Sequence, residues 1–262
     1  MTGGPLRWLG AALARYLSEP RDDESHGTTS RPELLGKTLC KGDVLLVEGS
    51  SRFATAICYL TQSTWSHAAL CVGSAPDVDN EDRGPWLVEA DINEGVRALP
   101  ISSFAQRHTR ICRPVGLDAK EIDQVASYAL GRVGNRYDLR NIIDLTRYLI
   151  STPPVPESMR RQMLSLGSGD PTRAICSSLI AEAFASVRYP VLPDIEVVRR
   201  RGPDGRCQAR EILHIRHSSL YMPRDFDVSP YFQIIKPTLA SGFDPHHVAW
   251  ATADMRNLPP CA

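Results

Sequence analysis

Cys176 is the residue of this sequence whose type and position best suit covalent chemistry. It follows the segment 170–172 (Asp-Pro-Thr), which favours the opening of a helix, and it precedes an apolar run. A thiol in the first turn of a helix lies beside unpaired backbone N–H groups that lower its pKa and favour the nucleophilic thiolate. The same N–H groups could stabilise an oxyanion. Read alone, however, a cysteine beside an apolar helix is more often a buried structural residue.

His67 and Glu89 are the residues that could assist such a thiol. His67 begins an apolar stretch after Trp65 and Ser66, which gives a general base a rigid mount. Alternation places Glu89 on the same strand face as Leu87, so we expect a partly buried carboxylate that needs a partner. An imidazole would supply that partner, and the carboxylate would orient it. A structural histidine and a solvent-facing glutamate are the alternatives on local pattern alone.

Short strands and amphipathic helices must position these residues. Turn residues between the apolar runs indicate an antiparallel sheet, because no crossover helix separates the first strands. The sequence therefore predicts an α+β fold in which an antiparallel sheet packs against helices, with the candidate nucleophile at a helix N-terminus. We expect strands at 44–47, 67–72, 86–92, 110–115 and within 230–237, and helices at 53–62, 118–133 (capped by Asp118), 139–150 and from Cys176 onward. The segment 199–210 is predicted to be a basic loop.

Composition excludes several classes of protein. Hydrophobic residues make up 42% and charged residues 23% of the 262, as in ordinary globular proteins. Lys plus Arg equals Asp plus Glu at 30 each, so no net charge attracts the whole chain to nucleic acid. The seven cysteines form no CxxC pair, which argues against a zinc ribbon and favours a reducing compartment.

Three segments organise the chain. Residues 1–32 are expected to form an amphipathic helix (5–19) and a polar linker, 33–240 the catalytic domain with an insertion at about 151–172, and 241–262 a tail. Neither a secretory signal nor an apolar run of membrane-spanning length is apparent. We therefore expect a cytoplasmic protein, with signal-independent export as an effector as the alternative.

Four short motifs resemble one known family. They are Gly42-Asp43 with its apolar run, Ser66-His67-Ala68-Ala69-Leu70, Val88-Glu89-Ala90, and Cys176-Ser177-Ser178-Leu179-Ile180. Together, over residues 40–237, they resemble the permuted branch of the NlpC/p60 papain-like superfamily, in particular its YiiX/YebB-like group. Lecithin:retinol acyltransferase-type enzymes are more distant relatives. In the permuted branch the His motif precedes the acidic residue and the Cys, as it does here.

The resemblance implies a permuted papain-like fold with Cys176 as nucleophile, His67 as general base and then acid, and Glu89 as the orienting group. Tyr137, in a segment that also resembles the family, is a candidate for lining the site or supporting the oxyanion. The implied reaction is acyl transfer through a thioester.

Three functions remain open on the sequence. The first is a cysteine hydrolase that cleaves an amide in a peptide or muropeptide. The second is a lipid-directed thioesterase, lipase or acyltransferase with the same residues, which touches a membrane surface through the N-terminal helix or the Arg199–Arg210 loop. The third is a non-catalytic binding module. We expect no cofactor, no metal and no specific nucleic-acid partner, because the His pairs at 214/217 and 246/247 lack further ligands and no stacking aromatics accompany the arginines.

Overall fold

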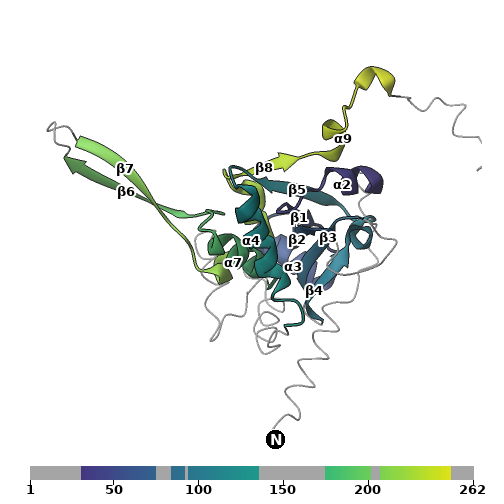
Figure 1. Cartoon of the computed structure of the whole chain (residues 1–262), viewed down its shortest axis with the longest axis horizontal. Helices are drawn as coiled ribbons and strands as arrows, with labels where there is room; N and C mark the ends of the chain where they lie inside the picture. The colour runs from purple at the N-terminus through teal and green to yellow at the C-terminus, as the bar shows by residue number, and fades with distance from the viewer. Residues whose placement is uncertain (1–30, 75–83, 92–93, 136–174, 202–206, 249–262) are drawn as a thin grey trace, which may run out of the picture.

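A six-stranded antiparallel sheet forms the centre of the molecule (Figure 1). The computed structural model describes residues 31–74, 84–91, 94–135, 175–201 and 207–248. The strand order is β4-β3-β2-β1-β5-β8, and every neighbouring pair is antiparallel. The strands are β1 (Val44–Val47), β2 (His67–Gly73), β3 (Trp86–Asp91), β4 (Gly95–Pro100), β5 (Thr109–Pro114) and β8 (Phe232–Ile235). The predicted α+β class with an antiparallel sheet is confirmed.

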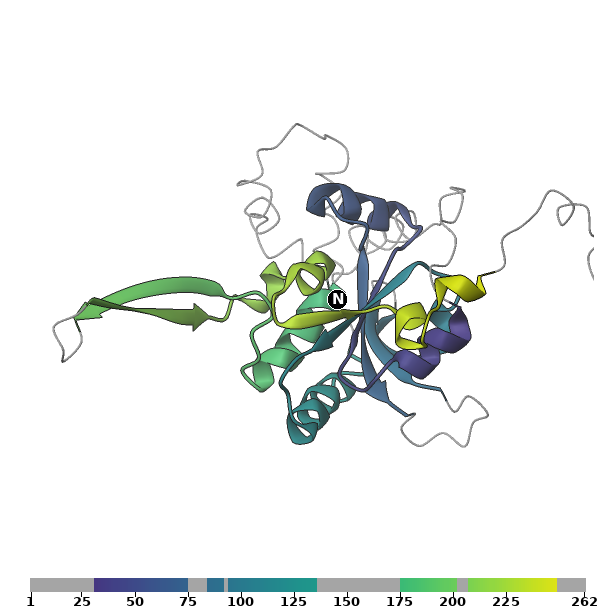
Figure 2. The same cartoon turned by 90° about the horizontal axis from the view of Figure 1, so that it is seen from above.

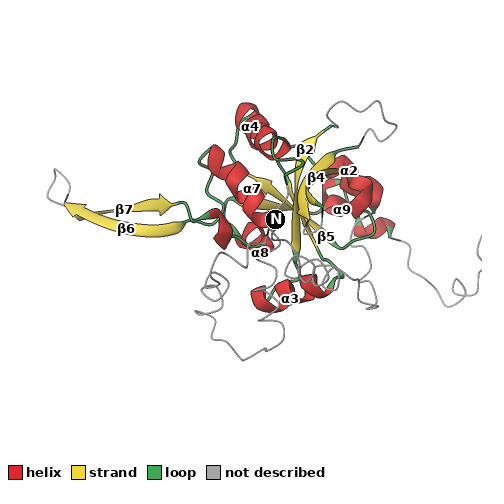
Figure 3. Ribbon diagram, turned by 90° about the horizontal axis from the view of Figure 1, so that it is seen from below, coloured by secondary structure: helices red, strands yellow, loops and turns green. Residues whose placement is uncertain are grey.

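Helices cover both faces of this sheet, as Figure 3 shows. On one face lie α4 (Ala119–Leu130) and α7 (Ile175–Ser186); on the other lie α2 (Pro32–Thr38) and the 3-10 helix η1 (Ile101–Phe104). Helix α3 (Arg52–Thr61) connects β1 to β2. The remaining short helices are η2 (Ser218–Leu220), α8 (Pro223–Val228), α9 (Pro237–Ala240) and η3 (Pro245–His247).

Strand β1 shows why the sheet is stable. Val44 and Leu46 join the core beneath α4 and α7, whereas Leu45 and Val47 join the core beneath α2 and η1. All four side chains are buried. A strand that is buried on both faces needs apolar residues at every position, which is why its sequence does not alternate.

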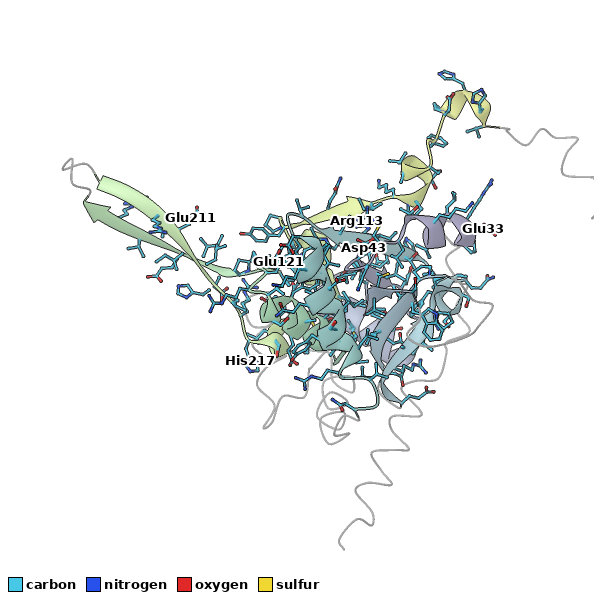
Figure 4. All side chains as sticks on the ribbon, in the orientation of Figure 1. Glu33, Asp43, Arg113, Glu121, Glu211 and His217 are labelled. Carbon is cyan, nitrogen blue, oxygen red and sulfur yellow. The ribbon has the colours of Figure 1, made fainter. Side chains whose placement is uncertain are left out.

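The turn before β1 is held by a buried ion pair. Asp43 is 1% exposed, and its two carboxylate oxygens accept hydrogen bonds from Nε and one terminal nitrogen of Arg113, both at 2.8 Å. The N–H of Cys40 donates to the same carboxylate at 2.7 Å. Figure 4 shows the two labelled side chains lying together beside the sheet. A bidentate pair of this kind is geometrically specific, so it ties β1 to β5 at a fixed register.

Helix α4 begins as its sequence predicts. The side chain of Asp118 accepts from the N–H of Glu121 at 2.8 Å, and Glu121 accepts in return from the N–H of Asp118 at 3.0 Å. This capping box satisfies N–H groups that have no partner inside the helix. The buried residues Val125, Ala126 and Ala129 face the sheet.

Two elements differ from the sequence prediction. Strand β4 was not predicted, because it lies at the edge of the sheet, where most of its side chains are only half-buried and the apolar pattern is weak. The segment 199–210 was predicted to be a basic loop, and this is wrong in the described part. Two paired strands, β6 (Asp194–Arg201) and β7 (Cys207–His214), extend through it and away from the body (Figure 2).

Some predicted elements lie outside the described residues. These are the N-terminal helix at 5–19 with most of its linker, the helix at 139–150, the insertion at 151–172 and Tyr137. The proposed domain boundaries therefore stay predictions. Within the ranges that the structure describes, no helix is both long enough and apolar enough to cross a membrane.

Candidate active site

His67 opens strand β2, and the two residues before it fix where that strand begins. The hydroxyl of Ser66 accepts a hydrogen bond from the N–H of Gly49 at 2.8 Å, and Ser66 is buried. The indole N–H of Trp65 donates to a carboxylate oxygen of Asp227 at 3.0 Å, and Trp65 is only 2% exposed. These two hydrogen bonds fix the backbone immediately before His67 and so fix the position of its imidazole.

Glu89 holds one side of the imidazole. Its Oε2 lies 2.6 Å from Nε2 of His67. Glu89 is 5% exposed, as the alternation of β3 predicted. Because Nε2 faces the carboxylate, Nδ1 is the ring nitrogen that remains for the thiol.

Arg97 holds the other carboxylate oxygen, and sequence reasoning missed it. It lies directly opposite Glu89 in the pairing of β3 with β4. Its Nε donates to Oε1 of Glu89 at 2.9 Å, and a terminal nitrogen lies 2.8 Å from the same oxygen. The signal that could have found it is an arginine between Val96 and Ala98, just after a Gly-containing turn. Arg97 keeps the buried carboxylate charged, since a buried anion needs a partner.

Cys176 lies in the first turn of α7, where the sequence placed it. The residue is 5% exposed, and α7 packs against β2 and β3. Its thiol interacts with the imidazole of His67 and with the backbone of Ala68. The structure thus brings together Cys176, His67 and Glu89 from three separate elements.

The protonation states of the pair follow from their contact. Burial alone would raise the pKa of the Cys176 thiol, but the neighbouring His67 cation outweighs burial and lowers it. Burial alone would lower the pKa of His67, but the charge on Cys176 and the hydrogen bonds to Cys176 and Glu89 raise it to about 10. At neutral pH this arrangement favours a thiolate beside an imidazolium, which is the reactive form of a cysteine nucleophile.

Glu89 stays ionised for the same reason. Burial acts to raise the pKa of its carboxyl group, but the hydrogen bond and charge of His67, followed by those of Arg97, lower it to about 2. An ionised carboxylate on the far side of the imidazole stabilises the imidazolium form.

The buried cysteines of the sheet form a contrast. Cys71 and Cys112 are both fully buried. Burial raises the pKa of Cys71 to about 12 and raises that of Cys112 as well. These thiols stay protonated and inert at neutral pH, so His67 is what distinguishes Cys176 from them.

A second polar cluster, which no sequence pattern indicates, lies beside the start of β2. Nδ1 of His108 lies 2.8 Å from Oε2 of Glu48, and the His108 ring packs edge-on against Trp65 with centroids 5.0 Å apart. The guanidinium carbon of Arg110 lies 4.9 Å from the centroid of the Trp65 ring. One terminal nitrogen of Arg110 donates hydrogen bonds to both carboxylate oxygens of Asp227, at 2.7 and 2.8 Å. These contacts hold Trp65 in place (we call them the clamp on Trp65), and they thereby restrict movement of the start of β2, where His67 lies.

The described residues provide no evidence for a metal site, and they do not include Tyr137. Across these residues no three His, Cys, Asp or Glu side chains are grouped so that they could hold a metal ion. Tyr137 lies outside the described ranges, so its role in the site stays a prediction.

The antiparallel sheet between helices, and the order of His67, Glu89 and Cys176 along the chain, resemble a permuted papain-like protein, in which the histidine precedes the cysteine. Residues 38–148 match the model of a family described as a permuted papain-like amidase enzyme, the YaeF/YiiX, C92 family. This match confirms the predicted resemblance to the permuted papain-like YiiX group. The matched segment contains His67 and Glu89 and ends before Cys176.

Several solved structures are similar to this chain, and one of them can be named. It is described as the metalloprotein yiiX from Escherichia coli O157:H7, with 16% identity and a TM-score of 0.44 over 75% of this chain and 96% of that one. Among curated proteins no match is found.

Proposed function

We propose that this protein is a cysteine hydrolase that cleaves an amide bond in a peptide or muropeptide through a thioester on Cys176. The observation that carries the proposal is the pairing of the Cys176 thiol with an imidazole that is held from behind by a buried, ionised Glu89. A structural cysteine has no need of either neighbour. The description of the matching family as amidases supports the choice of an amide as substrate.

The first half-reaction uses the ion pair directly. The Cys176 thiolate attacks the carbonyl carbon of the substrate, and the N–H groups at the start of α7 stabilise the oxyanion that forms. The His67 imidazolium donates its proton to the amide nitrogen as the C–N bond breaks. The amine leaves, and the acyl group stays on sulfur.

The second half-reaction reverses the proton movement. Neutral His67 accepts a proton from water, and the hydroxide so formed attacks the thioester carbon. The C–S bond breaks, which releases a carboxylic acid and restores the thiolate–imidazolium pair. Glu89 does not touch the substrate; it orients the ring and stabilises its cationic form in both steps.

The test is to trap the acyl-enzyme. The protein is mixed with a set of peptides and muropeptides, and intact-protein mass spectrometry follows the mass gained. We expect an adduct that maps to Cys176, is absent in Cys176→Ala and persists in Cys40→Ala, a matched control at an exposed cysteine. We expect His67→Ala to slow turnover about 100- to 10,000-fold. If the wild-type protein leaves all of these peptides and muropeptides uncleaved, the proposal that it cleaves an amide bond is wrong.

A second candidate is a lipid-directed thioesterase, lipase or acyltransferase with the same three residues. It is favoured by the apolar and basic side chains that β6 and β7 expose. Release of acyl chains from lipid or thioester substrates, without cleavage of amides, would select this candidate.

A non-catalytic binding module is the third candidate, and thiol labelling separates it from both enzymes. If Cys176 alkylates no faster than a model thiol at neutral pH, and His67→Ala does not slow it, the protein is a binder. We expect the opposite, because His67 lowers the pKa of the thiol.

A further inference from the structure

The two-stranded ribbon formed by β6 and β7 is a feature that the proposed chemistry does not use. We call these two strands, residues 194–201 and 207–214, the arm. Its strands pair with each other and form a sheet separate from the six-stranded one. Figures 1 and 2 show the arm projecting from the body beside α7. An isolated two-stranded ribbon is only marginally stable in water, so exposed side chains along it point to a partner.

One face of the arm exposes apolar side chains followed by a cation. Ile195 lies opposite Leu213 in the register, and Val197 is the next residue of β6 on the same face. These three side chains are 56%, 42% and 54% exposed, respectively. Arg199 follows on this face and is exposed. Glu211, labelled on the arm in Figure 4, lies opposite Val197 and so adds one exposed carboxylate to this face.

The opposite face differs because its acids already have partners. Oε2 of Glu196 lies 2.8 Å from Nε2 of His214. Asp194 accepts a hydrogen bond from Nε of Arg216 at 2.7 Å. Both carboxylates of this face thus have a side-chain partner near the base of the arm.

The outer part of the arm is strongly basic. Its described residues, 199–201 and 207–210, contain four arginines and no acid. The whole arm contains no Phe, Tyr or Trp. Single-stranded nucleic acid is usually held by aromatic stacking, and an apolar row gains little from a phosphate backbone. An anionic lipid surface, by contrast, accepts apolar side chains at the headgroup boundary and arginines at its phosphates.

We infer that the arm is a docking surface for an anionic membrane. The face with Ile195, Val197 and Leu213 lies along the bilayer surface, and the basic outer part contacts the lipid headgroups. The inference does not depend on what Cys176 cleaves: it concerns where the protein works.

Vesicle co-sedimentation of the full chain tests the inference. The probes are phosphatidylcholine vesicles with and without phosphatidylserine. We expect binding only to the vesicles with phosphatidylserine, and weaker binding as salt rises. Arg199→Gln with Arg210→Gln should weaken binding about 25-fold, since each arginine near an anionic surface contributes roughly a fivefold factor. Ile195→Thr with Val197→Thr, which keeps the preference for strands, should weaken it several-fold more.

A matched double variant outside the arm serves as the control. Arg107→Gln with Val115→Thr changes one exposed arginine and one valine that is 58% exposed, away from the arm. This variant should bind like the wild type, and all variants should keep the rate of Cys176 alkylation, which shows that the body is folded. The inference is overturned if the arm variants bind vesicles like the wild type, or if phosphatidylserine makes no difference to binding. It is also overturned if sedimentation without vesicles shows that the wild type is a dimer and that the arm variants are monomers, because the arm would then bind a second copy of the chain.

Discussion

Replacing Glu89 by Gln should lower the pKa of His67, and the size of the change can be worked out from the contact. The substitution removes the negative charge 2.6 Å from Nε2 but keeps the shape of the side chain. A hydrogen bond to a charged group contributes roughly 1.5–3 kcal/mol, and one pKa unit corresponds to about 1.4 kcal/mol. We therefore expect the pKa of His67 to fall from about 10 by about 1 to 2 units.

The sign of the effect on activity follows from the mechanism. The imidazolium must be present to protonate the leaving group, so activity is lost as pH rises through the pKa of His67. In Glu89→Gln this alkaline limb should move down by the same 1 to 2 units. NMR of histidine-labelled protein measures the pKa directly, and His67→Ala assigns the signal among the seven histidines. The pH profile of hydrolysis provides the second measurement.

Glu94→Gln is the matched control. Glu94 pairs with Arg97 on the exposed side and is 65% exposed, so its removal deletes a similar charge without touching His67. We expect little change in the His67 titration. If Glu89→Gln leaves the titration of His67 unchanged, or if Glu94→Gln shifts it equally, the orienting role of Glu89 is refuted.

Three further predictions follow from the same contacts. Asp43→Asn should lower the free energy of unfolding by roughly 2–4 kcal/mol in urea titrations, because it leaves Arg113 without its anion. In the native protein at neutral pH, iodoacetamide should modify Cys176 well before Cys71, because burial raises the pKa of Cys71 to about 12; peptide mapping measures this. Stability from Glu89 should be fully present above about pH 4.5 and lost as pH falls toward 2, by up to about 3 kcal/mol, and acid-unfolding curves of Glu89→Gln should lack this loss.

Each of these predictions has an outcome that contradicts it. Asp123→Asn, which breaks the exposed Lys41–Asp123 pair, should cost under about 1 kcal/mol; equal losses at Asp43 and Asp123 would show that burial of the pair does not matter. Equal labelling of Cys71 and Cys176 would contradict the assigned thiol pKa order. Identical acid-unfolding curves for wild type and Glu89→Gln would show that the pKa of Glu89 is not lowered by folding.

Much of the fold was predictable where one physical requirement dominates a segment. The apolar run of β1 reflects burial on both faces, and Asp118 caps α4 through a local hydrogen bond. The pairing of His67 with Glu89 was expected because a carboxylate on the face of Leu87 is buried and needs a partner. In each case the signal lies within a few residues of the feature.

The rest could not be predicted because it depends on contacts between distant segments. Arg97 is visible as a partner of Glu89 only once β4 is known to pair with β3, and an edge strand has a weak pattern. The clamp on Trp65 joins residues from β5 and α8. The sequence of 199–210 predicts a loop rather than strands, because a ribbon exposed on both faces needs no alternating apolar residues and accepts charged side chains equally well.

The order of the elements along the chain has a consequence for when the thiol becomes reactive. His67 lies on β2 and Cys176 on α7, with β3, β4, β5 and α4 between them in the sequence. Closing so long a loop is entropically costly, and such non-local contacts slow folding. Until α7 docks on the sheet, the thiol has no imidazolium beside it and keeps the pKa of an ordinary cysteine. In a nascent or partly folded chain the proposed nucleophile is therefore unreactive, and its reactivity depends on the completion of the tertiary structure.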